Sequence, residues 1–453
     1  MSGVLKQFLA TITCNLLAFA YGSVCTWASA NSATLESDEK TPLPSGKLDI
    51  SEISLVTSIP CFGAIFATLI YSLSIDRFSR KLLLVSIAIP QILSWLIILF
   101  AANAYHLYVA RFICGYAGGA SLVVIPIFVS EIAEDKVRGT LASMLILSCN
   151  AGCLFGFVVP IYFNYIEQIK INMMLPTLFL VLFYFFPETP EYLLKRNQKT
   201  LAEKSTNFYR GLKNPPSYEM KQINEQEKTY EKIEQESTSI SFSDFCTPAA
   251  KKAIKIAMVI GALNQFCGAF SMLNYANDIF KKAGSTLSPE KASVIVCIVQ
   301  LTANFLAMAL VDRAGRKLLM TISAFGTAFG LISMGLYDLY KDNLSEYRWI
   351  PIASFSTIIL IASMGMLPLT YVILSEIMPK KIKNMVILLA LEIMWFLAFI
   401  LVSFYPTLTD TIGTYNCMFM FATCCILGGI FYLIVLPETK GKSYEEIMQL
   451  LAK

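Results

Sequence analysis

Carboxamide and aromatic side chains lie inside stretches of the chain that are otherwise apolar. Asn264 and Gln265 are adjacent in one such stretch, and Asn274 and Tyr275 follow further along it. A carboxamide offers hydrogen-bond donors and an acceptor, and an aromatic ring offers a flat apolar face. Binding sites for small molecules combine a mostly apolar lining with a few such polar groups. This combination suits a small neutral ligand that has both polar groups and apolar faces.

Residues of the same kinds occur in other apolar stretches, and we include Asn150, Gln300, Tyr371 and Trp395 among the candidates. The alternative role for any one of these amides is a structural hydrogen bond between neighbouring helices. Glu392 is an acid within an apolar stretch, which is costly unless it faces a cavity or a partner. It could bind substrate hydroxyls, carry a proton, or pair with a neighbouring polar group. Asp278 is expected to be solvated.

Composition excludes most other classes of protein. Only 15% of the 453 residues are charged, whereas a soluble domain carries roughly 25%. The formal net charge of +4 provides no basic patch for nucleic acid. The chain contains one histidine, His106, and its twelve cysteines lack the spacing of paired metal ligands. We therefore expect no metal, no cofactor and no enzyme activity.

The apolar stretches have the length of membrane-spanning helices, since about 20 apolar residues cross a bilayer. We predict an all-α membrane protein with twelve transmembrane helices in two pseudo-symmetric six-helix halves. The predicted divisions are 1–187 for the first half, 188–255 for a cytoplasmic linker with short helices, 256–436 for the second half and 437–453 for a cytoplasmic tail. Within the linker, the Glu/Lys/Gln-rich run 219–236 is expected to be helical.

The first stretch has an alternative interpretation, because Ala28-Ser29-Ala30 behind it resembles a signal-peptide cleavage site. Its length, and the pairing of the two halves, favour a retained helix.

Lysine and arginine gather in short loops that alternate with more acidic ones, at 76–81, 131–138, 312–317 and 380–383. Basic short loops face the cytoplasm, so both termini are placed there, in a protein of the plasma membrane. The acceptor triplet Asn343-Leu344-Ser345 then falls in an outer loop, which makes Asn343 a candidate glycosylation site. The lipid bilayer is one expected partner, and we expect a monomer.

Three motifs occur twice in the same order, which indicates a duplication of a six-helix unit. The pairs are 76–81 with 312–317, Ser130-Glu131-Ile132 with Ser375-Glu376-Ile377, and Pro187-Glu188-Thr189 with Pro437-Glu438-Thr439. Transporters built from repeats bind substrate near the membrane midplane, between the halves.

These motifs resemble those of the sugar porter family of the major facilitator superfamily, over essentially the whole chain. The resemblance rests mainly on Pro437-Glu438-Thr439-Lys440-Gly441-Lys442, Asp312-Arg313-Ala314-Gly315-Arg316-Lys317 and Pro187-Glu188-Thr189-Pro190-Glu191. In finer detail the chain is similar to the insect facilitated trehalose transporter-like subgroup, through Asn264-Gln265-Phe266-Cys267-Gly268 and Met272-Leu273-Asn274-Tyr275. The resemblance implies facilitative transport of a neutral sugar, trehalose or a hexose, by alternating access.

The resemblance also implies two clusters of gating charges at the cytoplasmic face. The first-half cluster would contain Arg77, Arg80, Glu131, Arg138 and Glu188, and the second-half cluster Arg313, Arg316, Glu376, Lys383 and Glu438. The chain departs from the family at Ser79 and Asn384, where the family has glycine. The alternative is a solvated basic rim that only sets topology.

The substrate pattern of the family is altered here at about half of its positions. Asn274 stands where the family has Tyr, Tyr371 where it has Trp, and Ile146 where it has Gln, although Asn150 lies one turn further on the same face. In proton-coupled members, the arginine that matches Arg111 pairs with an acid in the first helix, but 19–23 contains none. We therefore expect a passive carrier. The alternatives are a proton-coupled sugar or polyol carrier that uses Glu392, and a sugar sensor that does not transport.

Overall fold

The computed structural model describes residues 3–211, 241–344 and 346–452. In this part of the chain twelve helical segments are long and apolar enough to cross a membrane, which confirms the predicted fold class. The run 219–236 lies outside the described residues.

Six long helices form the first half. They are α1 (Gly3–Leu35), α2 (Ile50–Ser74), α3 (Arg80–Leu99), α4 (Ala104–Ile132), α5 (Asp135–Tyr162) and α6 (Tyr165–Phe183). The second half contains two broken spanning segments as well as unbroken helices. Its elements are α11 (Pro248–Phe266), α12 (Ala269–Asn274), α13 (Ala276–Ala283), α14 (Pro289–Ala314), α15 (Arg316–Leu339), α16 (Ile350–Met364), α17 (Met366–Ile377), α18 (Lys383–Ile412) and α19 (Thr414–Ile434).

The seventh spanning helix begins earlier than the sequence suggested. Thr247 accepts a hydrogen bond from the Ala250 N–H, and Pro248 occupies the first helical position, where its missing N–H costs nothing. The helix therefore starts inside the segment that we expected to be linker.

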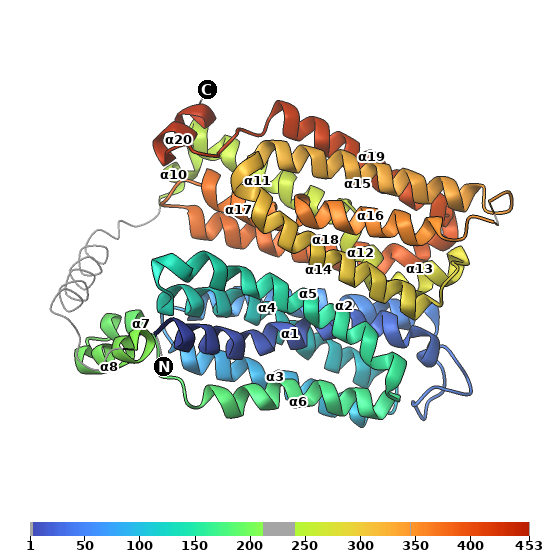
Figure 1. The fold of residues 1–453 in the computed structure, drawn as a ribbon, viewed down its shortest axis with the longest axis horizontal. Coiled ribbons are helices and arrows are strands. Elements are labelled where there is room, and N and C mark those ends of the chain that lie inside the picture. The colour runs from blue at the N-terminus through green and yellow to red at the C-terminus, as the bar shows by residue number, and fades with distance from the viewer. Residues whose placement is uncertain (1–2, 212–240, 345, 453) are drawn as a thin grey trace.

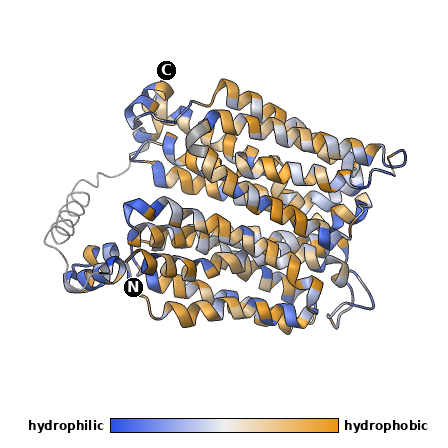
Figure 2. Ribbon diagram, viewed as in Figure 1, coloured by the Kyte–Doolittle hydropathy of each residue, from blue (hydrophilic) through white to orange (hydrophobic). Residues whose placement is uncertain are grey.

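Four short helices lie at one end of the bundle together with both termini (Figure 1). They are α7 (Pro190–Lys195), α8 (Lys199–Arg210), α10 (Phe242–Cys246) and α20 (Tyr444–Ala452). We call this the terminal end. The α1–α2 loop and α13 lie at the opposite end. Hydrophilic residues gather at both ends and the long helices between them are predominantly hydrophobic, as a bilayer requires (Figure 2).

Glycines allow the helices of the first half to pack closely. A Cβ placed on Gly152 of α5 would lie 2.0 Å from the Phe19 carbonyl oxygen of α1, and one on Gly22 would lie 1.9 Å from the Cys149 carbonyl oxygen. Small residues let membrane helices approach to this distance. The α1–α5 pair is thus held by backbone contact as well as by side chains.

The two halves meet along two pairs of helices, α2 with α18 and α5 with α14. The Phe62 and Phe399 rings are 5.5 Å apart across the first of these interfaces. At the opposite end, α1 also contacts α12 and α13.

Two spanning segments of the second half are broken near its centre. Gly268, at φ +75°, separates α11 from α12, and Gly365 separates α16 from α17. The second of these breaks occurs at Gly365, one turn before Pro368. Broken helices expose backbone polar groups that must be satisfied locally, and in transporters they frame substrate sites.

Candidate substrate site

A cavity of about 140 Å³ lies between the broken helices of the second half. Five candidates from the sequence line it together: Asn264 and Gln265 from α11, Gln300 from α14, Tyr371 from α17 and Trp395 from α18. The rest of the described lining is mostly apolar, with residues such as Leu273, Ile359 and Leu391. The sequence could not distinguish these apolar lining residues from the others, because every spanning helix is rich in apolar residues.

Asn264 joins α11 to the start of α17. Its Nδ2 donates to the Met366 carbonyl oxygen at 3.0 Å and to Thr370 Oγ1 at 3.3 Å. Its Oδ1 accepts from Gln265 Nε2 at 3.2 Å. The groups that the break at Gly365 leaves open are satisfied by Ser323 of α15, whose hydroxyl donates to the Ile361 carbonyl oxygen and accepts the Met366 N–H, while Asn264 ties α11 to the first turn of α17. Asn264 therefore has a structural role and also orients Gln265.

Gln300 has unused hydrogen-bonding capacity. Its Oε1 is buried and has no hydrogen-bond partner among the described residues, although the side chain lines the cavity. A buried polar atom without a partner costs free energy unless something fills the role. The edge of the Trp395 ring system meets Phe270 at 6.5 Å and 77°, so the same cavity carries a rigid aromatic wall.

Four other candidates do not line this cavity. Asn274 donates to the Phe270 carbonyl oxygen within its own helix, and the Tyr275 hydroxyl donates to the Val402 carbonyl oxygen at 2.8 Å. Asn150 is half-buried on α5. None of these three residues lines this cavity, because Asn150 belongs to α5 of the other half, and Asn274 and Tyr275 follow the break at Gly268.

Glu392, the fourth, faces the other half of the molecule. Thr68 Oγ1 of α2 donates to its Oε1 at 2.6 Å, and its Oε2 is buried without a partner among the described residues. Of the three interpretations left open by the sequence, the structure shows a pairing with a neighbouring polar group.

A second cavity, of about 90 Å³, was missed by the sequence analysis. It lies between the halves and is lined by residues of α5, α14 and α17, among them Ile146, Asn304 and Pro368. Asn304 Nδ2 donates to the Gln300 carbonyl oxygen at 2.8 Å, one turn away on α14. Asn304 lies four residues after Gln300, on the same face of the helix, and this spacing could have identified it from the sequence.

Arg111 is fully buried in the first half, and the described residues place no carboxylate within hydrogen-bond distance of it. Its Nε donates to the Val56 carbonyl oxygen at 2.9 Å and its Nη1 to that of Val24 at 2.6 Å. The guanidinium also lies 5.6 Å from the Trp27 ring.

At the terminal end, the first half contains a buried ion pair. Arg80 Nη2 and Glu131 Oε1 are 2.9 Å apart, and their side chains are only 2% and 4% exposed. The Thr189 hydroxyl donates to Glu131 Oε2 at 2.5 Å. Glu188 accepts the Lys81 N–H at 3.1 Å, at the start of α3.

The second half repeats this arrangement contact by contact. Arg316 Nη2 lies 3.3 Å from Glu376 Oε1, and the Thr439 hydroxyl donates to Glu376 Oε2 at 2.5 Å. Glu438 accepts the N–H groups of Arg316 at 3.0 Å and Lys317 at 3.1 Å, at the start of α15. The repeat in sequence is therefore also a repeat in geometry.

Backbone N–H groups hold Glu438 in its charged form. Burial would raise its pKa, but the N–H groups of Lys440, Arg316, Lys317 and Thr439 outweigh it and lower the pKa below its usual value. A carboxylate at a helix N-terminus is further stabilised by the helix dipole.

Other residues expected in the clusters lie outside them. Arg77 is exposed, and Arg138 pairs with Asp135 on its own helix at 2.9 Å. Lys383 begins α18 and makes no ion pair with a described residue. In this structure the described partners of Glu131 and Glu376 are Arg80 and Arg316 instead, so a gating role for these three residues stays a prediction. Arg313 lies outside the residues whose side chains are described.

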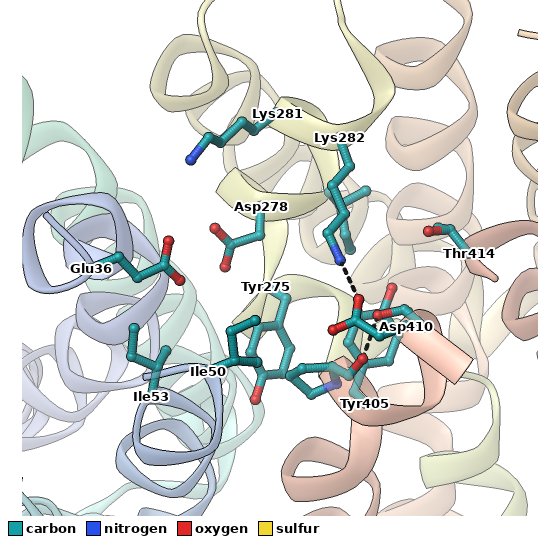
Figure 3. A pocket seen from close by; sticks show the side chains of 13 residues that line it. Glu36, Ile50, Ile53, Tyr275, Asp278, Lys281, Lys282, Tyr405, Asp410 and Thr414 are labelled. Carbon is teal, nitrogen blue, oxygen red and sulfur yellow. Dashed lines mark hydrogen bonds and ion pairs between the residues drawn. The ribbon is translucent and has the colours of Figure 1, made fainter. Parts of the chain in front are cut away.

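A cavity of about 300 Å³ near the opposite end lies between α1, α2, α13 and α18 (Figure 3). Asp278 lines it and accepts a hydrogen bond from Ser32. The prediction that Asp278 is solvated was wrong, since α1 covers it.

Comparison with known proteins decides the family. A family model described as "Sugar (and other) transporter" matches residues 9–451. The chain belongs to this sugar porter family.

Relatives in the family include insect proteins named facilitated trehalose transporter Tret1. The protein of Polypedilum vanderplanki is 30% identical over 98% of this chain and 88% of its own length. That of Anopheles gambiae is 31% identical over 82% of this chain, but the match spans only 47% of the mosquito protein.

Solved sugar porters share the fold. The inward-open xylose transporter XylE of E. coli superposes with a TM-score of 0.80 at 20% identity, over 98% of this chain and 99% of the other. XylE bound to 6-bromo-6-deoxy-D-glucose gives a TM-score of 0.74 at 20% identity, over 98% of this chain and 99% of that chain. The chain is thus a transporter of the major facilitator superfamily and not an enzyme.

Proposed function

We propose that this sugar porter moves a neutral sugar, trehalose or a hexose, down its gradient by alternating access. The observation that carries the proposal is the cavity in which the amides of Gln265 and Gln300 meet the aromatic side chains of Tyr371 and Trp395. Amides match sugar hydroxyls in both donor and acceptor roles, and the cavity adjoins two broken helices, where movement is easiest. The trehalose names of the insect relatives support a disaccharide among the substrates.

Passive transport is supported by the surroundings of Arg111. Backbone carbonyl groups and Trp27 hold its guanidinium, where a proton-coupled carrier would need an acid that gains and loses a proton. Without such an acid beside Arg111, sugar movement is not tied there to a proton. Substrate binding alone then shifts the populations of the two states.

A proton-coupled carrier is the second candidate, because Glu392 keeps one buried oxygen without a partner between α2 and α18. It predicts that an inward pH gradient drives sugar against its own gradient, and that Glu392→Gln abolishes the accumulation but keeps exchange. We expect no accumulation with either protein. Proton-driven accumulation in the wild type would replace the passive mechanism.

We further propose a monomer in the plasma membrane, with the terminal end in the cytoplasm. The concentration of lysine and arginine in the short loops of that end supports this orientation. Asn343 is exposed in the α15–α16 loop at the opposite end, and its glycosylation remains a prediction. A sugar sensor on this fold would bind the same ligand, and exchange of labelled sugar separates it from a carrier.

The test of the binding site compares two buried glutamines. Gln300→Met keeps the side-chain volume but removes the amide that lines the cavity, so KM for the transported sugar should rise by roughly 5- to 150-fold, the value of one hydrogen bond of about 1–3 kcal/mol. Gln91 is the control, because it is equally buried and also has an unpartnered Oε1, yet it lies in α3 and does not line this cavity.

Gln91→Met should leave KM unchanged in the same uptake assay with trehalose, glucose and fructose. Equal effects of the two substitutions, with equal protein in the membrane, would reject this cavity as the substrate site.

A further inference from the structure

The two halves are joined at the opposite end by hydrogen bonds between α1 and α13. The Ser32 hydroxyl donates to Asp278 Oδ1 at 3.0 Å, and the Asn277 N–H donates to Ser29 Oγ at 3.2 Å. Ser293 of α14 holds the Asn277 side chain from behind, at 2.6 Å. This contact closes the bundle at that end, and it depends on an acid.

Asp278 faces a second acid across the cavity. Figure 3 shows Glu36, at the end of α1, and Asp278, on α13, pointing toward each other, with Lys281 above them. Lys282 is directed away from the pair, to Asp410 of α18 at 3.1 Å. Two carboxylates, Glu36 and Asp278, therefore face each other across the cavity, while Lys282 pairs with Asp410 instead of with them.

The surroundings of Asp278 raise its pKa to about 6, chiefly through burial and also through the charge of Glu36. The Ser32 hydrogen bond, Lys281 and Lys282 act in the opposite direction but do not compensate. Of the other segments that pack on α13, α14 presents Ser293 and α16 presents the Phe355 ring to Phe280, while the α15–α16 loop adds one charge, Lys341, whose Nζ donates to the Lys282 carbonyl oxygen.

We propose that Asp278 is a proton-operated latch, which holds the mouth at the opposite end closed when the carboxyl is neutral and releases it when the carboxyl is ionised. The latch rests on the alternating access proposed above, and it adds control by pH to a carrier that is not driven by protons. Opening the mouth would separate α1 from α13 and return Asp278 to water.

The sign follows from linkage between protonation and conformation. Asp278 has a pKa of about 6 with the mouth closed and an ordinary value of about 4 once it is hydrated. Protonation therefore favours closure. The stabilisation is complete below the ordinary value and is lost as pH rises through about 6. Between pH 7 and pH 5 the closed-to-open ratio should rise by about tenfold.

The experiment measures opening directly, without sugar. A thiol is introduced by Ile53→Cys, at a buried position of α2 that lines the cavity, and its labelling by a membrane-impermeant methanethiosulfonate is followed in proteoliposomes from pH 5 to pH 8. The reference is Ser45→Cys, at an exposed position of the α1–α2 loop. The ratio of the two rates cancels the pH dependence of thiol reactivity.

We expect this ratio to fall by about tenfold from pH 7 to pH 5, and to become independent of pH when Asp278→Asn is added, because asparagine keeps a hydrogen-bond acceptor but cannot ionise. Glu36→Gln should lower the midpoint of the transition by removing the like charge. The Glu36→Gln variant therefore tests the proposal even if the Asp278→Asn variant does not fold.

A flat ratio in the parent protein, or the same pH dependence with Asp278→Asn, overturns the latch. Sugar counterflow on the same proteoliposomes at a single pH reports the proposed function separately. Counterflow with flat labelling rejects the latch alone, whereas pH-dependent labelling without counterflow rejects transport.

Discussion

The repeated charge clusters allow one prediction to be checked within a single molecule. Glu131→Gln and Glu376→Gln make the same chemical change at positions related by the internal repeat. Arg80 and Glu131 are 2% and 4% exposed, whereas Arg316 and Glu376 are 17% and 26% exposed. The first substitution leaves a positive charge buried without its partner, and the second leaves one that water reaches.

The magnitudes follow from this difference in burial. Removing one partner of a buried ion pair costs about 3–5 kcal/mol, whereas solvent-exposed pairs contribute about 0–1 kcal/mol. We expect Glu131→Gln to lower the free energy of unfolding by about 3–5 kcal/mol and Glu376→Gln to lower it by close to 0–1 kcal/mol. For a unit the size of one half, the larger loss corresponds to roughly 6–20 °C in Tm.

The assay is thermal unfolding of the purified protein in one detergent, followed by a fluorescent thiol reagent that reacts with the buried cysteines. Adding Arg80→Met to Glu131→Gln should recover part of the loss, because it removes the uncompensated charge. Equal losses in the two halves, or a double variant less stable than Glu131→Gln alone, would refute the reasoning from burial.

Three further predictions concern the site and its supports. Gly365→Ala should cost about 1–3 kcal/mol and slow transport, because the new Cβ would lie 2.5 Å from the Ser323 Cβ; thermal unfolding and initial uptake rates measure both. Glu438→Gln should lower Tm near neutral pH. Its effect should disappear in acid, because the lowered pKa of Glu438 means that the stabilisation is present above the ordinary value and is lost as pH falls through the lowered one. Thr68→Val should destabilise the α2–α18 interface by about 1–3 kcal/mol, since Glu392 loses its only described donor, and a melting temperature equal to that of the wild type would contradict this.

Much of the fold was predictable, because a bilayer imposes strict requirements on composition. Twelve apolar stretches and three duplicated motifs were sufficient for the two halves, and Arg80, Glu131, Arg316 and Glu376 were correctly grouped as charges of one end. Acids repeated beside arginines at helix ends are costly unless they pair, so their type and position indicated their contacts.

The site was predictable only in part. Asn264, Gln265 and Gln300 converge as expected, but Asn274 and Tyr275 turn to their own half, because the break at Gly268 changes the direction of the segment that carries them. The burial of Asp278 could not be read from its neighbours in sequence. It arises from the packing of α1 over α13, a contact between residues far apart in the chain.

The central claim is solute movement through the cavity between broken helices, and counterflow tests it most directly. Purified protein is reconstituted into vesicles preloaded with unlabelled trehalose or glucose, and a trace of labelled sugar is added outside. We predict a transient accumulation of label above its equilibrium level, which Gln300→Met weakens and Gln91→Met preserves. Folded wild-type protein that shows no accumulation with trehalose, glucose, fructose or polyols would contradict the account.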